Sequence, residues 1–102
     1  MNPTITVEEL KQRMDKGENL LVVDVREPWE YEEFNIGAKN IPLATVMTIV
    51  EDYADNKNDE IIVHCKMGGR SAQAQGLLTQ LGFTNVRNLE GGVEAWKAKF
   101  VK

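Results

Sequence analysis

The 102-residue chain predicts an α/β fold in which a mostly parallel sheet is covered by helices on both faces. Short apolar runs alternate with helical patterns, which is the order of repeated strand–helix units. Residues 20–23 and 61–63 are wholly apolar, as expected of strands buried on both faces. The alternation continues without a repeat or a linker, so we expect a single domain over residues 1–102.

Strands are expected at Ile5, Leu20–Val23, Ala38–Ile41, Glu60–His64 and around Val86. Two polar residues directly follow the second and fourth of these runs: Asp24 and Cys65. Ligands of parallel sheets bind outside the carboxyl ends of the strands. Asp24 and Cys65 are therefore expected to face one site.

Capping and breaking residues delimit five expected helices. Thr6, with Glu9 three residues later, forms a capping box before the first helix, and Gly17 follows it. Prolines suit the starts of the next two helices, and glycines end the fourth and precede the fifth. The expected ranges are 7–16, 28–34, 43–52, 71–81 and 93–100.

Composition excludes several classes of function. The net charge is −4, from 12 basic and 16 acidic residues, so neither nucleic acid nor an anionic membrane is an expected partner. No apolar run approaches the length of about 18 residues that a membrane-spanning helix needs. The first residues show no secretory signal, so we expect a reducing cytoplasm, where a free thiol survives.

The single cysteine, Cys65, begins the most informative segment of the chain. A β-branched apolar run leads into it, and two glycines and a predicted helix follow. Backbone N–H groups and the positive end of the helix dipole meet at such a position, where they lower the pKa of a thiol and bind an anion. One cysteine cannot form an intramolecular disulfide, and with only His64 beside it no zinc site is expected.

The residues after Cys65 are interpreted as an anion-binding loop. Main-chain N–H groups of residues 67–70 can turn inward around the sulfur, and two glycines permit positive φ there. A lysine and an arginine add two cations, and a serine is placed to cap the helix and to donate weakly to a thiolate. This combination disfavours the alternative that Cys65 is only a small buried hydrophobe. The loop residues expected to bind substrate are Lys66, Met67, Gly68, Gly69, Arg70 and Ser71.

Four polar residues outside the loop are also candidates for roles at the site. Asp24 either orients the loop or caps the next helix, and Arg26 and Glu30 are spaced for a local ion pair. His64 lies on a predicted buried strand, so we expect a hydrogen-bonded core histidine rather than a catalytic base.

Four segments resemble motifs of the rhodanese family of sulfurtransferases, and together they cover nearly the whole chain. The segment Asp24-Val25-Arg26-Glu27-Pro28-Trp29-Glu30-Tyr31 is similar to the first signature of the family, and Asn40-Ile41-Pro42-Leu43 is similar to the next. Residues 65–71 resemble the active loop, and residues 89–96 resemble the closing motif. The resemblance implies a three-layer fold with a five-stranded sheet between helices, and a persulfide carried on Cys65.

The chain departs from the family pattern before Asn40. Family members usually have Gly-His-Ile-Pro-Gly-Ala there, whereas this chain has Phe34-Asn35-Ile36-Gly37-Ala38, one residue shorter and without the histidine. That histidine is usually treated as structural, so we expect a rearranged turn and retained activity.

The resemblance implies a sulfurtransferase that uses no metal or organic cofactor. Cys65 would take sulfur from thiosulfate or a persulfide and pass it to cyanide or to a thiol, such as that of a thioredoxin-like protein. Lys66 and Arg70 would hold the anionic end of the donor, and Asp24 and Arg26 would support the loop.

Two other functions stay open. Phosphatases that resemble rhodaneses have five residues between cysteine and arginine, whereas four residues separate Cys65 from Arg70 here. The smaller ring suits one sulfur atom better than a phosphoryl group, which disfavours a phosphatase or an arsenate reductase. A non-enzymatic binding module of the same fold is disfavoured because the chain retains the cysteine, the glycines and the cations.

Overall fold

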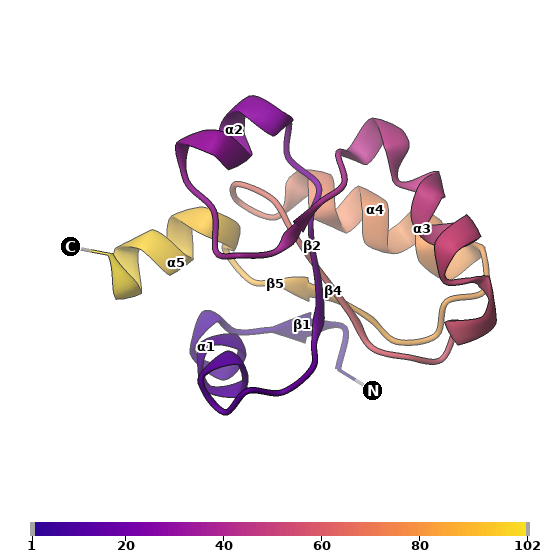
Figure 1. The fold of residues 1–102 in the computed structure, drawn as a ribbon, viewed down its shortest axis with the longest axis horizontal. Coiled ribbons are helices and arrows are strands. Elements are labelled where there is room, and N and C mark those ends of the chain that lie inside the picture. The colour runs from indigo at the N-terminus through magenta and orange to yellow at the C-terminus, as the bar shows by residue number, and fades with distance from the viewer. Residues whose placement is uncertain (1, 102) are drawn as a thin grey trace.

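A computed structural model describes residues 2–101, which form one sheet with helices on both faces (Figure 1). All strand pairs are parallel, and the strand order is β1-β5-β4-β2-β3. The prediction of an α/β fold with a five-stranded parallel sheet is confirmed. The strands are β1 (Thr4–Ile5), β2 (Leu21–Asp24), β3 (Lys39–Asn40), β4 (Ile61–His64) and β5 (Val86–Leu89).

A helix lies in each expected range, with ends that differ by one or two residues in most cases, but the range 43–52 is divided and its α-helix begins only at Met47. Within residues 2–101, no helix combines the length and the apolar character needed to span a membrane. The helices are α1 (Val7–Asp15), α2 (Pro28–Glu33), α3 (Met47–Asp52), α4 (Gly69–Gln80) and α5 (Gly92–Phe100), with 3₁₀ turns η1 (Leu43–Thr45) and η2 (Ala54–Asn56).

Strand β4 lies at the centre of the sheet, between β5 and β2, and all four of its residues are buried. Successive side chains of a strand point to opposite faces. Ile61 and Val63 accordingly enter one core cluster and Ile62 enters the other. The two cores explain why this run is wholly apolar and does not alternate.

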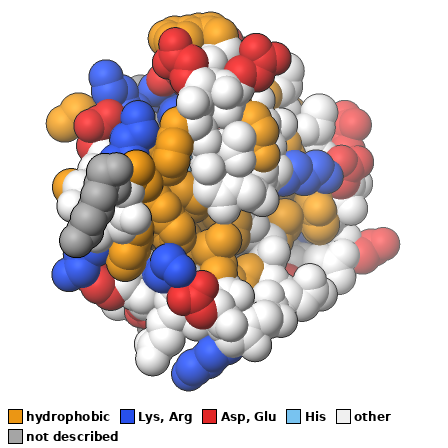
Figure 2. Space-filling view, turned by 60° about the vertical axis from the view of Figure 1, so that its left-hand side comes forward, with side chains coloured by type: hydrophobic (Ala, Val, Ile, Leu, Met, Phe, Trp, Pro, Cys, Tyr) orange, Lys and Arg blue, Asp and Glu red, His pale blue; other side chains and the backbone are white. Residues whose placement is uncertain are grey.

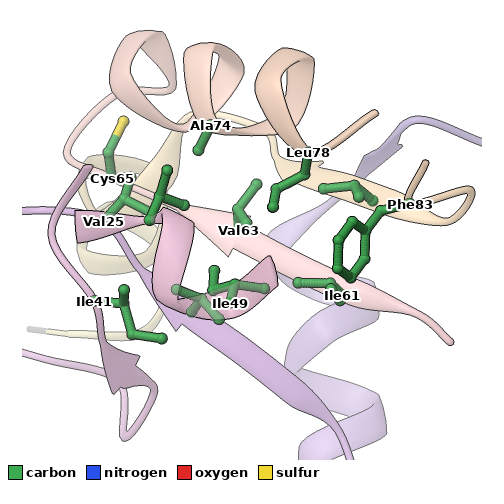
Figure 3. Packing of buried hydrophobic residues seen from close by; sticks show 12 residues of the cluster. Val25, Ile41, Ile49, Ile61, Val63, Cys65, Ala74, Leu78 and Phe83 are labelled. Carbon is green, nitrogen blue, oxygen red and sulfur yellow. The ribbon is translucent and has the colours of Figure 1, made fainter. Parts of the chain in front are cut away.

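One core lies between the sheet and the helices α3 and α4. Figure 3 shows Cys65 at one end of this cluster and Phe83 with Ile61 at the other. The second core lies under α1 and α5, and Figure 2 turns that end of the molecule toward the viewer, where apolar side chains remain visible among charges of both signs. Helix α2 lies at the carboxyl end of the sheet (Figure 1).

The expected helix over residues 43–52 is divided into η1 and α3. The N–H of Thr45 bonds to the carbonyl of Pro42, and that of Val46 bonds to the carbonyl of Leu43, the i to i+3 pattern of a 3₁₀ turn. The hydroxyl of Thr45 also bonds to the Pro42 carbonyl. Two consecutive β-branched residues, Thr45 and Val46, weaken the preference for an α-helix here.

The expected helix over residues 71–81 begins two residues earlier, at Gly69. Gly68 has a φ of 121°, which ends the loop and allows Gly69 and Arg70 to adopt helical conformation. Positive φ is therefore used by only one of the two loop glycines, contrary to the expectation for Gly69. This early start places the first N–H groups of α4 next to the cysteine.

His64 ends β4 in register with Asp24 of β2 and is fully buried. Neither ring nitrogen has a hydrogen-bond partner among residues 2–101, so the expectation of a hydrogen-bonded histidine is wrong. Burial lowers the pKa of His64 to about 4 despite the attraction of Asp24, whose Oδ2 lies 3.9 Å from Nε2. The imidazole is therefore neutral at pH 7.

We predict that His64 makes the fold less stable as the pH falls from about 6.5, the usual pKa of histidine in an unfolded chain, toward 4. In this window the unfolded chain binds a proton that the folded chain does not. The loss is about 3 kcal/mol, and it can be measured as the free energy of unfolding in urea at several pH values.

The variant His64→Leu should show a shallower dependence of unfolding free energy on pH between 6.5 and 4.5, above the range in which most carboxylates titrate. An unchanged slope would contradict the assignment to His64.

Candidate functional site

Cys65 follows β4 directly and is almost completely buried. It closes the core cluster under α4, and Figure 3 shows its sulfur pointing away from Val63 and Ile49. The apolar strand thus fixes the backbone of the cysteine, and the loop that follows surrounds the sulfur.

The first turn of α5 holds the loop by its carbonyl groups. The N–H of Val93 donates to the carbonyl of Cys65 at 2.9 Å, and the N–H of Glu94 donates to the carbonyl of Lys66 at 3.0 Å. These are N–H groups that a helix start leaves without partners in the helix itself. Because a trans peptide is planar, its N–H points opposite to its carbonyl, so the N–H groups of Lys66 and Met67 point away from α5.

Two donors contact the sulfur of Cys65 directly. The N–H of Gly68 lies 3.0 Å from Sγ and the hydroxyl of Ser71 lies 3.3 Å from it. Burial alone would raise the pKa of Cys65. The hydrogen bonds from the Ser71 hydroxyl and from the N–H groups of Ser71, Gly68 and Met67 outweigh that effect and lower the pKa below its ordinary value. The site therefore favours a thiolate.

Asn88 of β5 is a site residue that the sequence analysis missed. Its Oδ1 lies 2.6 Å from the Ser71 hydroxyl, and its Nδ2 donates to the carbonyl of Gly68 at 3.3 Å. Asn88 thereby positions Gly68 and Ser71 beside the sulfur. Oδ1 of Asn88 and Sγ of Cys65 both lie within reach of the single Ser71 hydroxyl proton, which only one of them accepts at a time. The available signal was only its position: Asn88 directly precedes the closing motif, in a short strand that also contains Arg87.

Asp24 and Arg26 form a buried ion pair beside the loop. The guanidinium of Arg26 donates to both oxygens of Asp24 at 2.7 to 3.1 Å and to the carbonyl of Phe34 at 2.7 Å. Asp24 does not cap the next helix, because Glu27 and Glu30 form the capping box of α2. Arg26 and Asp24 thus tie β2 to the start of the segment that differs from the family pattern.

That segment, residues 34–38, forms a compact turn. Asn35 accepts a hydrogen bond from the N–H of Gly37 and donates to the carbonyl of Tyr31. The hydroxyl of Tyr31 donates to the carbonyl of Ala38. The turn is therefore closed by side chains of α2 and of the turn itself, with Gly37 at a φ of 85°.

Arg70 and Glu30 form a second ion pair, across 40 residues of sequence. Two nitrogens of Arg70 donate to the two oxygens of Glu30, at 2.6 and 2.9 Å. The hydrogen bond from Arg70 outweighs burial and lowers the pKa of Glu30 to about 2. The expected pair between Arg26 and Glu30 is wrong, because each residue has a different partner.

Lys66, Met67 and Gly69 are the exposed candidates of the loop. Lys66 makes no ion pair with any residue between 2 and 101, and Met67 is 70% exposed. Lys66 is thus a cation available to a ligand. In the described part of the chain, no three histidine, cysteine, aspartate or glutamate side chains gather as metal ligands would.

The close contact between α5 and the loop predicts a large cost for Gly92→Ala. Gly92 has a φ of 57°, and a Cβ there would lie 2.4 Å from the carbonyl oxygen of Cys65. We expect this variant to be about 2–4 kcal/mol less stable in chemical denaturation. Gly69→Ala is the matched control, since Gly69 is helical and has open space around it, and should change stability by less than about 1 kcal/mol. Similar losses in both variants would contradict this account of Gly92.

The contact between Ser71 and the sulfur predicts that Ser71→Ala raises the pKa of Cys65, because the thiolate loses a donor. The rate of alkylation by iodoacetamide, measured against pH, should rise at higher pH than in the wild type and reach a similar plateau. Gln73→Ala, an exposed change on the same helix, is the control. An unshifted curve for Ser71→Ala would show that the hydroxyl does not stabilise the thiolate.

Comparison with known proteins identifies relatives over most of the chain. Thiosulfate sulfurtransferase PspE of Escherichia coli is 39% identical over 70 residues, which cover 68% of this chain and 67% of PspE. A sulfurtransferase of Allochromatium vinosum is 34% identical over 93 residues, which cover 90% of this chain and 85% of that protein. Other relatives are longer: the chain spans 52% of YrkF of Bacillus subtilis and 24% of MoeZ of Mycobacterium tuberculosis.

Solved structures show the same arrangement. The human single-domain sulfurtransferase TSTD1 superposes with a TM-score of 0.83 at 28% identity, covering 97% of this chain and 98% of TSTD1. The family pattern named Rhodanese-like domain matches residues 6–99, which include every loop residue around Cys65. This chain therefore belongs to the rhodanese-like family.

Proposed function

We propose that this protein is a sulfurtransferase that carries sulfane sulfur as a persulfide on Cys65. The observation that carries the proposal is a buried thiol with a lowered pKa that accepts hydrogen bonds from Gly68 and Ser71. Relatives named as sulfurtransferases support sulfur transfer in general. A single free thiol suits a reducing cytoplasm, which we propose as the location.

The reaction takes place in two steps. The thiolate of Cys65 attacks the outer sulfur of thiosulfate, the S–S bond of the donor breaks, and sulfite leaves with the bonding electron pair. With a persulfide donor, the leaving group is the donor's thiolate. An acceptor thiolate or cyanide then attacks the terminal sulfur of the Cys65 persulfide and regenerates the Cys65 thiolate, so ping-pong kinetics are expected.

The loop contributes positioned donors and charge. The N–H groups that stabilise the thiolate also face the charge on the persulfide, and they need no rearrangement during the reaction. Lys66 is exposed and has no ion pair with the described residues, so it is assigned to the anionic end of the donor. Arg70 is occupied by Glu30 and is assigned to act there through its charge, without direct hydrogen bonds to the donor. A thioredoxin-like protein is a suitable acceptor because it presents a reactive thiol.

Phosphoryl transfer is the weaker candidate. Only four residues separate Cys65 from Arg70, and the guanidinium of Arg70 is held by Glu30. A tyrosine-phosphatase mechanism needs that guanidinium for the phosphoryl oxygens. The protein should release no measurable phosphate from an aryl phosphate under conditions in which it transfers sulfur from thiosulfate.

Treatment with thiosulfate should add about one sulfur atom to the intact mass of the protein, and dithiothreitol should remove it. Cys65→Ser should fold normally, gain no mass and lack transfer activity, since Cys65 is the only thiol. Mass spectrometry of both proteins before and after reduction is the measurement. Failure of the wild type to load sulfur, or full activity in the serine variant, would contradict the proposed function and favour a binding module.

A further inference from the structure

We propose that Glu30 determines which sulfur donors the site accepts, by neutralising the charge of Arg70. This inference rests on the proposed function and adds a specificity-determining residue to it. Glu30 belongs to α2, outside the loop, and acts through Arg70 without touching the sulfur. Its effect is to make the mouth of the site less attractive to a dianion such as thiosulfate than the loop sequence alone would suggest.

The ion pair is fixed from the side of Glu30. Both carboxylate oxygens bind Arg70, and Oε1 also accepts the N–H of Glu27 at 3.0 Å. The Glu30 side chain is only 11% exposed, whereas that of Arg70 is 35% exposed. The carboxylate is therefore held within α2, and it orients the more exposed guanidinium at the edge of the site.

The surroundings of the pair are nearly balanced in charge. A small pocket of about 160 Å³ lies between α2, α5 and the loop. Its charged lining consists of three cations and three carboxylates: Arg26, Lys66, Lys97, Glu30, Glu33 and Glu94. Arg70, the partner of Glu30, does not line the pocket, so the pocket and the pair together hold four cations and three carboxylates. Lys66 is the loop cation without an ion pair among residues 2–101. Neutralising the cations weakens the electrostatic attraction of the site for a dianion more than for a donor with little net charge.

Removing the charge of Glu30 therefore tests the idea. Glu30→Gln retains a carbonyl oxygen for the N–H of Glu27 and leaves Arg70 as an uncompensated cation. We expect kcat/KM for thiosulfate to rise by about 5- to 30-fold at low ionic strength, mainly through KM. The persulfide of cysteamine, whose net charge is near zero, should change far less. Glu33→Gln is the matched control, because it removes the same charge from the same helix without an ion pair to Arg70.

Removing the charge of Arg70, alone and together with that of Glu30, gives a second test. Arg70→Gln leaves Glu30 uncompensated and should lower the thiosulfate-to-persulfide ratio of kcat/KM. The double variant Glu30→Gln/Arg70→Gln has the net charge of the wild type and should return that ratio to within about threefold of the wild-type value. If the double variant stays as low as Arg70→Gln, Arg70 clamps the donor directly and the proposal is overturned.

Other outcomes also decide the matter. An equal change for both donors in Glu30→Gln, a fall for thiosulfate, or an equal rise in Glu33→Gln would overturn the role of Glu30. The intact mass after treatment with each donor distinguishes a failure of this inference from a failure of the proposed function. If Cys65 gains sulfur in all variants but the thiosulfate-to-persulfide ratio of kcat/KM does not change, only the role of Glu30 is contradicted. No loading in any variant contradicts the proposed function itself.

Discussion

The site depends on two hydrogen bonds from the first turn of α5 to the carbonyls of Cys65 and Lys66. They satisfy N–H groups that a helix start must otherwise leave to water, and they fix the direction of the loop peptides. With the carbonyls held on one side, the amides are free to face the sulfur on the other. Gly92 makes this possible, because a side chain at that position would overlap the two carbonyls. The closing helix is thus as much a part of the site as the loop.

The local features of this design could be predicted from the sequence. The apolar run into Cys65 predicts a buried strand, and the glycines followed by a helical pattern predict a loop at a helix start. Strand and helix positions followed from short-range signals of this kind. The exception was also local. After Pro42 the helix is divided because the N–H groups of Thr45 and Val46 bond to the carbonyl three residues earlier, as in a 3₁₀ turn, and not to the one four residues earlier, as in an α-helix.

The partners of the charged residues could not be predicted in the same way. Spacing suggested that Arg26 would pair with Glu30, four residues away, but α2 turns Glu30 toward Arg70 and leaves Arg26 with Asp24. Asn88 reaches Gly68 and Ser71 only because β5 lies beside β4 in a particular register. His64 was expected to find a hydrogen bond, but its neighbours in the sheet offer none. Each of these facts depends on strand order, which no short segment encodes.

The two arginines near the site show how burial separates residues of one type. Arg26 is almost fully buried, and Nε and Nη2 of its guanidinium donate to Asp24 and to the carbonyl of Phe34. Only Nη1 is left without a hydrogen-bond partner among residues 2–101. Arg70 is partly exposed and bound on one side only, by Glu30. Removing one partner costs much more folding free energy in a buried ion pair than in an exposed one. The pair of Arg26 therefore lies inside the fold, whereas the pair of Arg70 lies at the edge of the candidate site, where we propose that its charge affects the choice of donor.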